Sequence, residues 1–265
     1  LLKSLPELIL QPTTEVHLLE IFAFAQQNAI PLTIRGAGTW GYGGSVPVTG
    51  GLIIDLGLMD TIQVDAASQR FTAGPGARFS DIERELERHG LTLLSMPSGK
   101  GGTLMGWLAT GGIGLGTLLN GPVRNQLITI RVITPDDPDT AYFLSTEGQM
   151  GIIVQATLQA GLQPDRWYPF AIPFDDPSSA YDFVQQLARH PFLKPWAVIV
   201  HHREFMRGLK LQSDCKMAIR DGEVVMAVFT HEAEVRQFED YLDKRGLRPA
   251  DVESASWLWD ERFFP

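Results

Sequence analysis

Glycine is distributed unevenly along this chain. Of its 26 glycines, 20 fall in the 86 residues from Gly36 to Gly121, and only six lie in the 144 residues that follow. Glycine lacks a Cβ atom, so it weakens regular helices and lets the backbone turn sharply or approach a ligand closely. The clustering therefore predicts loops with a local binding task in the first half of the chain.

One stretch of this region has the length of a membrane span. Residues 101–123 are 23 consecutive residues without a charge, but eight of them are glycine. A spanning helix needs about 20 predominantly apolar residues, and dense glycine opposes a long helix. We expect no transmembrane span here, and the N-terminal residues lack the pattern of a signal peptide.

Composition and charge exclude several classes of protein. With 265 residues, 44% hydrophobic and 20% charged, the chain is typical of a globular protein of one large or two modest domains. A net charge of −9 argues against binding nucleic acid. The single cysteine, Cys215, excludes a disulfide framework and a cysteine metal cluster. We expect a cytoplasmic protein without a bound metal.

Hydrophobic periodicity predicts alternating helices and strands up to about residue 161. The first helix would bury Val16, Leu19 and Phe22, and the second would start at a capping box formed by Ser80 and Glu83. The predicted elements are a helix at 14–29, a strand at 30–35, a glycine loop at 36–51, strands at 52–56, 61–65 and 69–73, a helix ending near 90, and strands at 127–134 and 152–158.

The pattern changes after residue 161. A strand at 167–173, a helix at 177–189 that begins at Asp176-Pro177, strands at 196–201 and 223–229, and a helix at 231–245 follow in order. This is most of a ferredoxin-like β-α-β-β-α-β unit, whose last strand would fall at 249–254.

The first glycine loop, RGAGTWGYGG from Arg35, directly follows a predicted strand. Successive N–H groups of bare backbone can turn toward an anion and hold a phosphate, with Thr39 as a hydroxyl donor. The loop contains neither the Walker sequence nor the Rossmann fingerprint. A cluster of β-turns without a ligand is the alternative interpretation.

The second glycine segment, KGGTLMGWLATGGIG from Lys100, places apolar side chains and two hydroxyl groups among bare backbone. A flat, largely apolar heterocycle with polar edges requires such a wall. The two segments together predict a dinucleotide with a pyrophosphate and a large ring.

Five motifs in order carry a family resemblance. The two segments, with GGLIIDL, AGPGARFSDIERELERHGLTL and STEGQMGIIVQATL, resemble over residues 10–160 the PCMH-type FAD-binding domain of the vanillyl-alcohol oxidase and p-cresol methylhydroxylase superfamily. The C-terminal part, including WDERF from Trp259, is similar to the cap of the FAD-linked oxidase branch with glycolate and D-lactate dehydrogenases. The resemblance implies an α+β protein: a PCMH-type FAD-binding domain of two α/β subdomains at 1–161, then a partial ferredoxin-like α+β cap at 162–265.

The resemblance also implies which residues contact FAD. Residues 36–40 would hold the pyrophosphate, the second segment would line the ribityl chain and ring, and the TEGQMG motif would close on the cofactor through its backbone. The implied cofactor-binding residues are Arg35, Gly36, Ala37, Gly38, Thr39, Trp40, Pro97, Ser98, Thr103, Gly106, Ala109, Thr110, Gly112, Glu147, Gly151, Ile152 and Ile153. For Arg35, a structural ion pair is an equal alternative.

Departures from the family pattern are informative. Thr39 stands where some branches carry a flavin-linking His, and the second segment has no Cys, so we expect noncovalent FAD. The stretch 135–140 is shorter than the family's usual connection, and relatives continue their cap beyond the position of Pro265. We therefore expect an incomplete cap.

The expected reaction is transfer of a hydride from a small alcohol or 2-hydroxy acid to FAD, with a base taking the hydroxyl proton. Candidate catalytic residues are His201 and His202, with Arg203 to pair a substrate carboxylate; a solvated strand edge is the alternative interpretation. The C-terminal aromatic residues Trp257, Trp259, Phe263 and Phe264 would form either a substrate wall or core packing.

Two function hypotheses follow. The chain is either an FAD-dependent oxidoreductase that uses a hydroxylated substrate and an unidentified electron acceptor, or a flavin-binding subunit whose site is completed by a partner subunit or a second copy.

Overall fold

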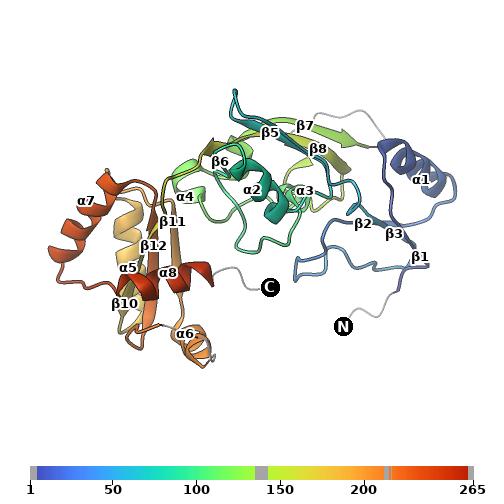
Figure 1. The fold of residues 1–265 in the computed structure, drawn as a ribbon. Coiled ribbons are helices and arrows are strands. Elements are labelled where there is room, and N and C mark those ends of the chain that lie inside the picture. The colour runs from blue at the N-terminus through green and yellow to red at the C-terminus, as the bar shows by residue number, and fades with distance from the viewer. Residues whose placement is uncertain (1–4, 135–142, 212–214, 216, 262–265) are drawn as a thin grey trace. The chain divides into compact units, whose positions relative to one another are not determined.

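The computed structural model describes residues 5–134, 143–211, 215 and 217–261. It divides into two compact units (Figure 1). Unit 1 holds residues 1–114 and 122–163, and unit 2 holds residues 115–121 and 164–265. Both units mix helices and strands, as the α+β prediction requires.

Unit 1 begins with a parallel sheet of order β1-β3-β2. The strands are β1 (Leu8–Leu10), β2 (Leu32–Arg35) and β3 (Leu52–Asp55). The glycine loop connects β2 to β3, which pair in register from Leu32 and Leu52. The sequence pattern did not predict β1.

Helix α1 (Glu15–Gln27) begins at the Thr14 cap, whose hydroxyl accepts the His17 N–H at 3.2 Å. The predicted buried stripe is wrong, because Val16 and Leu19 are 62% and 50% exposed. Leu18 instead packs with Ile54 and the strand residues around it, and Phe22 lies at the margin of that cluster.

A second sheet of unit 1 is antiparallel, with order β4-β5-β8-β7. Its core side carries Phe71 and Leu158, both fully buried. Two short strands, β6 and β9, pair separately. The bounds are β4 (Ile62–Asp65), β5 (Arg70–Ala73), β6 (Leu91–Thr92), β7 (Leu127–Ile133), β8 (Ile152–Gln159), β9 (Gly161–Leu162) and a 3-10 turn at Val123–Asn125.

Helix α2 (Phe79–Glu87) buries Ile82 and Leu86 as predicted, but the predicted capping box is wrong. The helix already includes Ser80. Its first free N–H groups are bound by the second glycine segment: Phe79 donates to the Gly102 carbonyl at 3.0 Å and Ser80 to that of Lys100 at 3.1 Å. Backbone carbonyls from about 20 residues away thus replace the side-chain cap.

Within the charge-free stretch, α3 (Leu104–Ala109) is only six residues long. Among the residues that the structure describes, no helix is long and apolar enough to cross a membrane. Trp107 of α3 packs edge-on against Phe79 of α2, with ring centroids 5.3 Å apart.

Unit 2 is built on an antiparallel sheet of order β10-β12-β11. This is the order that a ferredoxin-like unit gives its first three strands. Its elements are α4 (Thr117–Asn120), β10 (Tyr168–Phe174), α5 (Pro177–Ala188), β11 (Ala197–His201), α6 (Arg203–Lys210), β12 (Glu223–Phe229), α7 (Glu232–Asp243) and α8 (Val252–Asp260).

Helices α5 and α7 cover one face of this sheet. Phe183 of α5 and Phe238 of α7 meet Phe229 of β12 in a single buried cluster. Val235, Phe238, Tyr241 and Leu242 contribute to it, as the helical pattern predicts.

The predicted strand at 249–254 is wrong. Only Ala250 pairs with the edge of β10, donating its N–H to the Ala171 carbonyl at 2.8 Å. The chain then enters α8, because the Asp251 carboxylate accepts the N–H and hydroxyl of Ser254, both at 2.8 Å, and caps a helix.

Trp259 of α8 packs in the core of unit 2. It is 5% exposed, and its ring lies 5.9 Å from that of Trp167 and 6.2 Å from that of Trp196. Phe263, Phe264 and the stretch 135–140 lie outside the described residues.

Candidate cofactor-binding site

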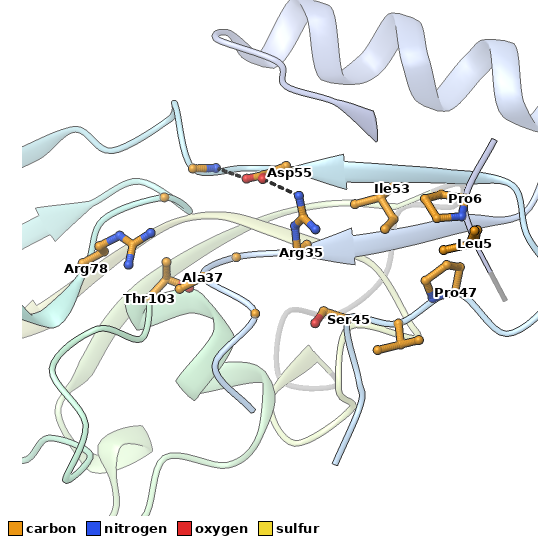
Figure 2. A pocket seen from close by; sticks show the side chains of 15 residues that line it. Leu5, Pro6, Arg35, Ala37, Ser45, Pro47, Ile53, Asp55, Arg78 and Thr103 are labelled. Atoms are coloured by element: carbon orange, nitrogen blue, oxygen red, sulfur yellow. Dashed lines mark hydrogen bonds and ion pairs between the residues drawn. The ribbon is translucent and has the colours of Figure 1, made fainter. Parts of the chain in front are cut away.

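A pocket of about 520 Å³ opens in unit 1 at the carboxyl ends of β2 and β3 (Figure 2). Predicted residues of both glycine segments line it: Gly36, Ala37 and Gly38 from the first and Thr103 from the second. The other lining residues are Leu5, Pro6, Arg35, Ser45, Val46, Pro47, Ile53, Asp55, Gly57, Gly76 and Arg78.

The backbone that follows β2 offers free donors. Among the described residues, no hydrogen bond uses the N–H groups of Gly36, Ala37, Gly38 or Thr39. Gly38 has φ +68°, which favours glycine. Gly36, Ala37 and Gly38 line the pocket and Thr39 follows them, so consecutive N–H groups without a partner among the described residues fit the phosphate-binding geometry predicted from the sequence.

The two glycine segments meet within contact distance. A Cβ atom on Gly36 would lie 2.3 Å from the Thr103 hydroxyl oxygen, and one on Gly102 would lie 3.3 Å from that of Thr39. Thr103 is buried, and its hydroxyl accepts the Gly106 N–H at 3.3 Å, capping α3. The absence of Cβ atoms is therefore what allows these segments to approach.

Arg35 forms the structural ion pair that was one of its two interpretations. Its Nη2 donates to Asp55 Oδ2 at 2.8 Å, the contact drawn in Figure 2. Burial raises the pKa of Asp55, but hydrogen bonds from the Gly57 N–H and from Arg35 outweigh it and lower the pKa below its usual value. Asp55 stays ionised, so this pair brings no net charge to the pocket.

Arg78 is the second guanidinium of the pocket, and the sequence pattern did not single it out. Its Nη1 donates to the Gly101 carbonyl at 3.0 Å, and among the described residues it has no carboxylate partner. Arg78 lies in the AGPGAR motif, and this motif was the sequence feature that could have pointed to it. Its Gly76 has no room for a Cβ atom, which would lie 2.4 Å from the Leu56 carbonyl oxygen.

The TEGQMG motif contacts the end of α3, away from the residues that line this pocket. The Glu147 N–H donates to the Ala109 carbonyl at 2.9 Å, and Glu147 has φ +54°. Thr110 caps α3 at its C-terminus through a 3.0 Å bond to the Trp107 carbonyl. The structure thus brings two of the predicted segments together at α3.

Two of the remaining predicted residues are glycines held by close packing. A Cβ atom on Gly112 would lie 1.9 Å from Val123 Cγ1, and one on Gly151 would lie 2.7 Å from Thr134 Cγ2. Ile152 and Ile153 are buried in β8, where they pair with β7. Trp40 is half exposed, and its ring lies tilted against that of Tyr42, with centroids 5.1 Å apart. Pro97 lies against Gly114, Ser98 is exposed and Gly106 lies in α3.

The candidate catalytic residues lie in unit 2, and the structure separates their environments. His201 ends β11, is 7% exposed, and stacks on Phe205 with 5.2 Å between ring centroids. Burial lowers the pKa of His201 to about 4, and its Nε2 has no hydrogen-bond partner in the described chain.

The adjacent histidine is accessible. His202 has a side chain that is 66% exposed; its Nδ1 accepts the Glu204 N–H at 3.2 Å, and its Nε2 lies 3.8 Å from the buried Glu223 carboxylate. Arg203 donates its backbone N–H to the same carboxylate at 3.2 Å and its guanidinium to the Asp175 carbonyl.

No cluster of three or more His, Cys, Asp or Glu side chains that could hold a metal ion occurs in the described part of the chain. The site is therefore built from backbone donors, hydroxyl groups and arginines.

Comparisons with known proteins identify the domain that contains this pocket. Residues 6–137 match the sequence family described as FAD binding domain. The D-lactate dehydrogenase of Archaeoglobus fulgidus is 26% identical over 68% of this chain and 44% of its own length. Glycolate oxidase subunit GlcD of Bacillus subtilis is 25% identical over 62% of this chain and 38% of its own.

The fold also matches solved structures. An alkyldihydroxyacetonephosphate synthase superposes with a TM-score of 0.80 at 19% identity, covering 96% of this chain and 56% of its own. The chain thus spans about half the length of the relatives it matches. FAD is the cofactor that the matched domain is named for, and through residues 6–137 the chain belongs to the PCMH-type FAD-binding domain family.

Proposed function

We propose that this chain carries the FAD-binding half of an oxidoreductase that takes a hydride from a small alcohol or 2-hydroxy acid. The observation that carries the proposal is the pocket lined by Gly36, Ala37 and Gly38, whose N–H groups have no partner among the described residues, and by Thr103, which contacts Gly36. The names of the D-lactate dehydrogenase and the glycolate oxidase subunit support the substrate class.

The chain's own residues would hold the cofactor without a covalent link. The N–H groups of Gly36 to Thr39 and the Thr103 hydroxyl would bind the pyrophosphate, with Arg78 as the nearby cation that no carboxylate neutralises among the described residues. Bound FAD supplies the hydride acceptor. Thr39 stands at the position of a flavin-linking His in some relatives, which supports noncovalent binding.

For the base, access favours His202 over His201. A base must reach the substrate hydroxyl within hydrogen-bond distance, and His202 is exposed whereas His201 is buried under Phe205. The buried Glu223 carboxylate lies 3.8 Å from Nε2 of His202. Arg203 would pair a substrate carboxylate next to it.

The alternative is a flavin-binding subunit without turnover of its own. The name of one relative, a glycolate oxidase subunit, favours it. In either case the proposal includes an unidentified electron acceptor and a cytoplasmic location. It also includes a partner subunit or a second copy of the chain.

Flavin binding and flavin reduction test the two hypotheses separately. We expect the purified chain to retain or take up FAD. Gly38→Val should abolish this, because a branched side chain is strained at φ +68° and would lie beside Arg35 and Ser45. Gly41→Ala is the matched control, since its Cβ would meet nothing within 4 Å. Equal FAD occupancy in both variants would refute the cofactor site.

Anaerobic addition of D-lactate, glycolate and simple polyols then separates enzyme from subunit. Bleaching of the flavin absorbance by any of them, without a partner, supports the oxidoreductase and contradicts the subunit. A chain that binds FAD but is not bleached supports the subunit.

A further inference from the structure

A second cavity lies in unit 2, far along the chain from the residues of the FAD pocket. It measures about 480 Å³ and lies between the C-terminal turns of α5 and α7, two helices that Figure 1 labels. Arg189, His190 and Asp182 line it from the α5 side, and Tyr241 and Arg245 line it from the α7 side. Its size is in the range of small-molecule sites, about 300–1,000 Å³.

Two arginines of this cavity have no carboxylate partner. Arg207, Arg220, Arg236 and Arg248 of the same unit each form an ion pair. Arg189 and Arg245 form none with any described residue, although both are exposed in a chain of net charge −9. Arg245 is held over the Tyr241 ring, with its Cζ 3.6 Å from the ring centroid, and its Nη1 donates to the Tyr241 carbonyl at 3.3 Å, which leaves Nη2 and Nε as donors for a ligand.

The Tyr241 hydroxyl is an unsatisfied polar group in the same wall. Tyr241 is 6% exposed, and its hydroxyl has no hydrogen-bond partner in the described chain. Buried hydroxyls in proteins are normally hydrogen-bonded. A ligand in the cavity would provide the missing partner.

His190 adds a further donor. Its Nδ1 accepts the N–H groups of Phe192 at 3.3 Å and Leu193 at 3.0 Å, so Nε2 is the ring nitrogen left to donate to a ligand. Its ring meets Tyr241 edge-on, with centroids 5.3 Å apart. Asp182 is the one carboxylate of the lining, so donors and positive charge dominate the cavity.

We propose that this α5–α7 cavity binds a small organic anion, with Arg189 and Arg245 on its phosphate or carboxylate group and the Tyr241 hydroxyl as a hydrogen-bond partner. None of the residues involved belongs to the FAD pocket, so the proposal does not depend on the proposed function. The structural alternative is that both arginines only compensate the dipoles at the ends of α5 and α7, and it predicts no saturable binding.

The test measures thermal unfolding of the full chain with excess FAD, in rising inorganic phosphate or succinate at constant ionic strength. Wild type should show saturable stabilisation by one or both probes. The concentration that gives half of this effect should rise about tenfold or more in Arg189→Gln and Arg245→Gln, because each removes a charged hydrogen bond. Arg236→Gln, on the same helix but paired with Glu232, should respond as wild type.

If only phosphate stabilises the wild-type chain, the group that the cavity binds is a phosphate. If only succinate does so, the group is a carboxylate. Stabilisation that does not saturate, or that is equal in wild type and both arginine variants, overturns the proposal.

Tyr241→Phe provides a variant that keeps the ring. It should weaken probe binding without lowering the unfolding midpoint in probe-free buffer, and a lowered midpoint with unchanged binding would overturn the role of the hydroxyl.

Discussion

Gly36 offers the sharpest test of the contact between the two glycine segments. In Gly36→Ala, the new Cβ atom would lie 2.3 Å from Thr103 Oγ1, while the Cβ and Cγ2 atoms of Thr103 stay at 3.4 Å. The methyl group therefore conflicts with a single atom. Thr103 can relieve the conflict only by moving its hydroxyl away, and that hydroxyl caps α3 through the Gly106 N–H.

The magnitude follows from these two effects. Loss of a threonine cap costs about 1 kcal/mol, and forcing an extra methyl group into a packed site costs about 1–3 kcal/mol. Thr103 is only 4% exposed, so its side chain has little room to move. We expect Gly36→Ala to lower the free energy of unfolding by about 2–4 kcal/mol.

A double-mutant cycle separates the conflict from a general effect on the loop. Thr103→Ala alone should cost about 1 kcal/mol for the lost cap. Because it also removes the conflicting oxygen, the Gly36→Ala/Thr103→Ala pair should be no less stable than Thr103→Ala. The coupling would then be about 2 kcal/mol or more, as contacting residues can show.

Urea unfolding followed by circular dichroism measures all four proteins, with Gly41→Ala as the control in the same loop. The control should be within about 0.5 kcal/mol of wild type. Two outcomes would show that Gly36 and Thr103 are not in contact. In the first, the losses of stability in the two single variants add up in the double variant. In the second, Gly36→Ala is as stable as the control.

Two further predictions concern unit 2. Burial lowers the pKa of His201 from 6.5 to about 4. As the pH drops, the unfolded chain therefore protonates His201 before the folded chain does, and the free energy of unfolding should fall by roughly 3 kcal/mol between about pH 6.5 and about pH 4. Urea unfolding across this range should show a weaker pH dependence of stability in His201→Phe, and the same pH dependence as wild type would contradict burial of His201. Trp259→Ala should lower stability by about 3–5 kcal/mol, because Trp259 packs against Trp167 and Trp196; a loss below about 1 kcal/mol in urea unfolding followed by tryptophan fluorescence would instead favour a role at a surface.

Local patterns predicted the elements whose apolar residues follow one clear period. Strong periodicity identified α7 and its buried face, and alternation identified β7 and β8. Helix α1 was harder, because its sequence HLLEIFAFA is apolar on several faces, and only packing against Ile54 decides that Leu18 is buried rather than Leu19.

Tertiary contacts explain the other differences. The start of α2 is satisfied by the carbonyls of Lys100 and Gly102, which no local capping pattern can indicate. The start of α8 was readable, because Asp251 stands three residues before Ser254 in the spacing of a helix cap. The residues of a fourth ferredoxin-like strand at 249–254 overlap this cap, and in the structure the helix forms.

The candidate site shows the same division. Glycine clustering located both backbone segments, because a segment that must approach another closely without Cβ atoms can be recognised from its glycines alone. Asp55 and Arg78 were not singled out, because an ion pair with Arg35 and a bond to the Gly101 carbonyl depend on which strands lie side by side.

The two adjacent histidines of unit 2 show why residue type alone cannot assign a catalytic role. His201 is the last residue of β11 and pairs with Val224, so its ring is carried into the interior beneath Phe205. His202 leaves the strand and caps α6, which places its ring in solvent above the Glu223 carboxylate. One change of backbone direction therefore gives two neighbouring imidazoles opposite environments: the first is buried, with its pKa lowered to about 4, and the second is open to solvent.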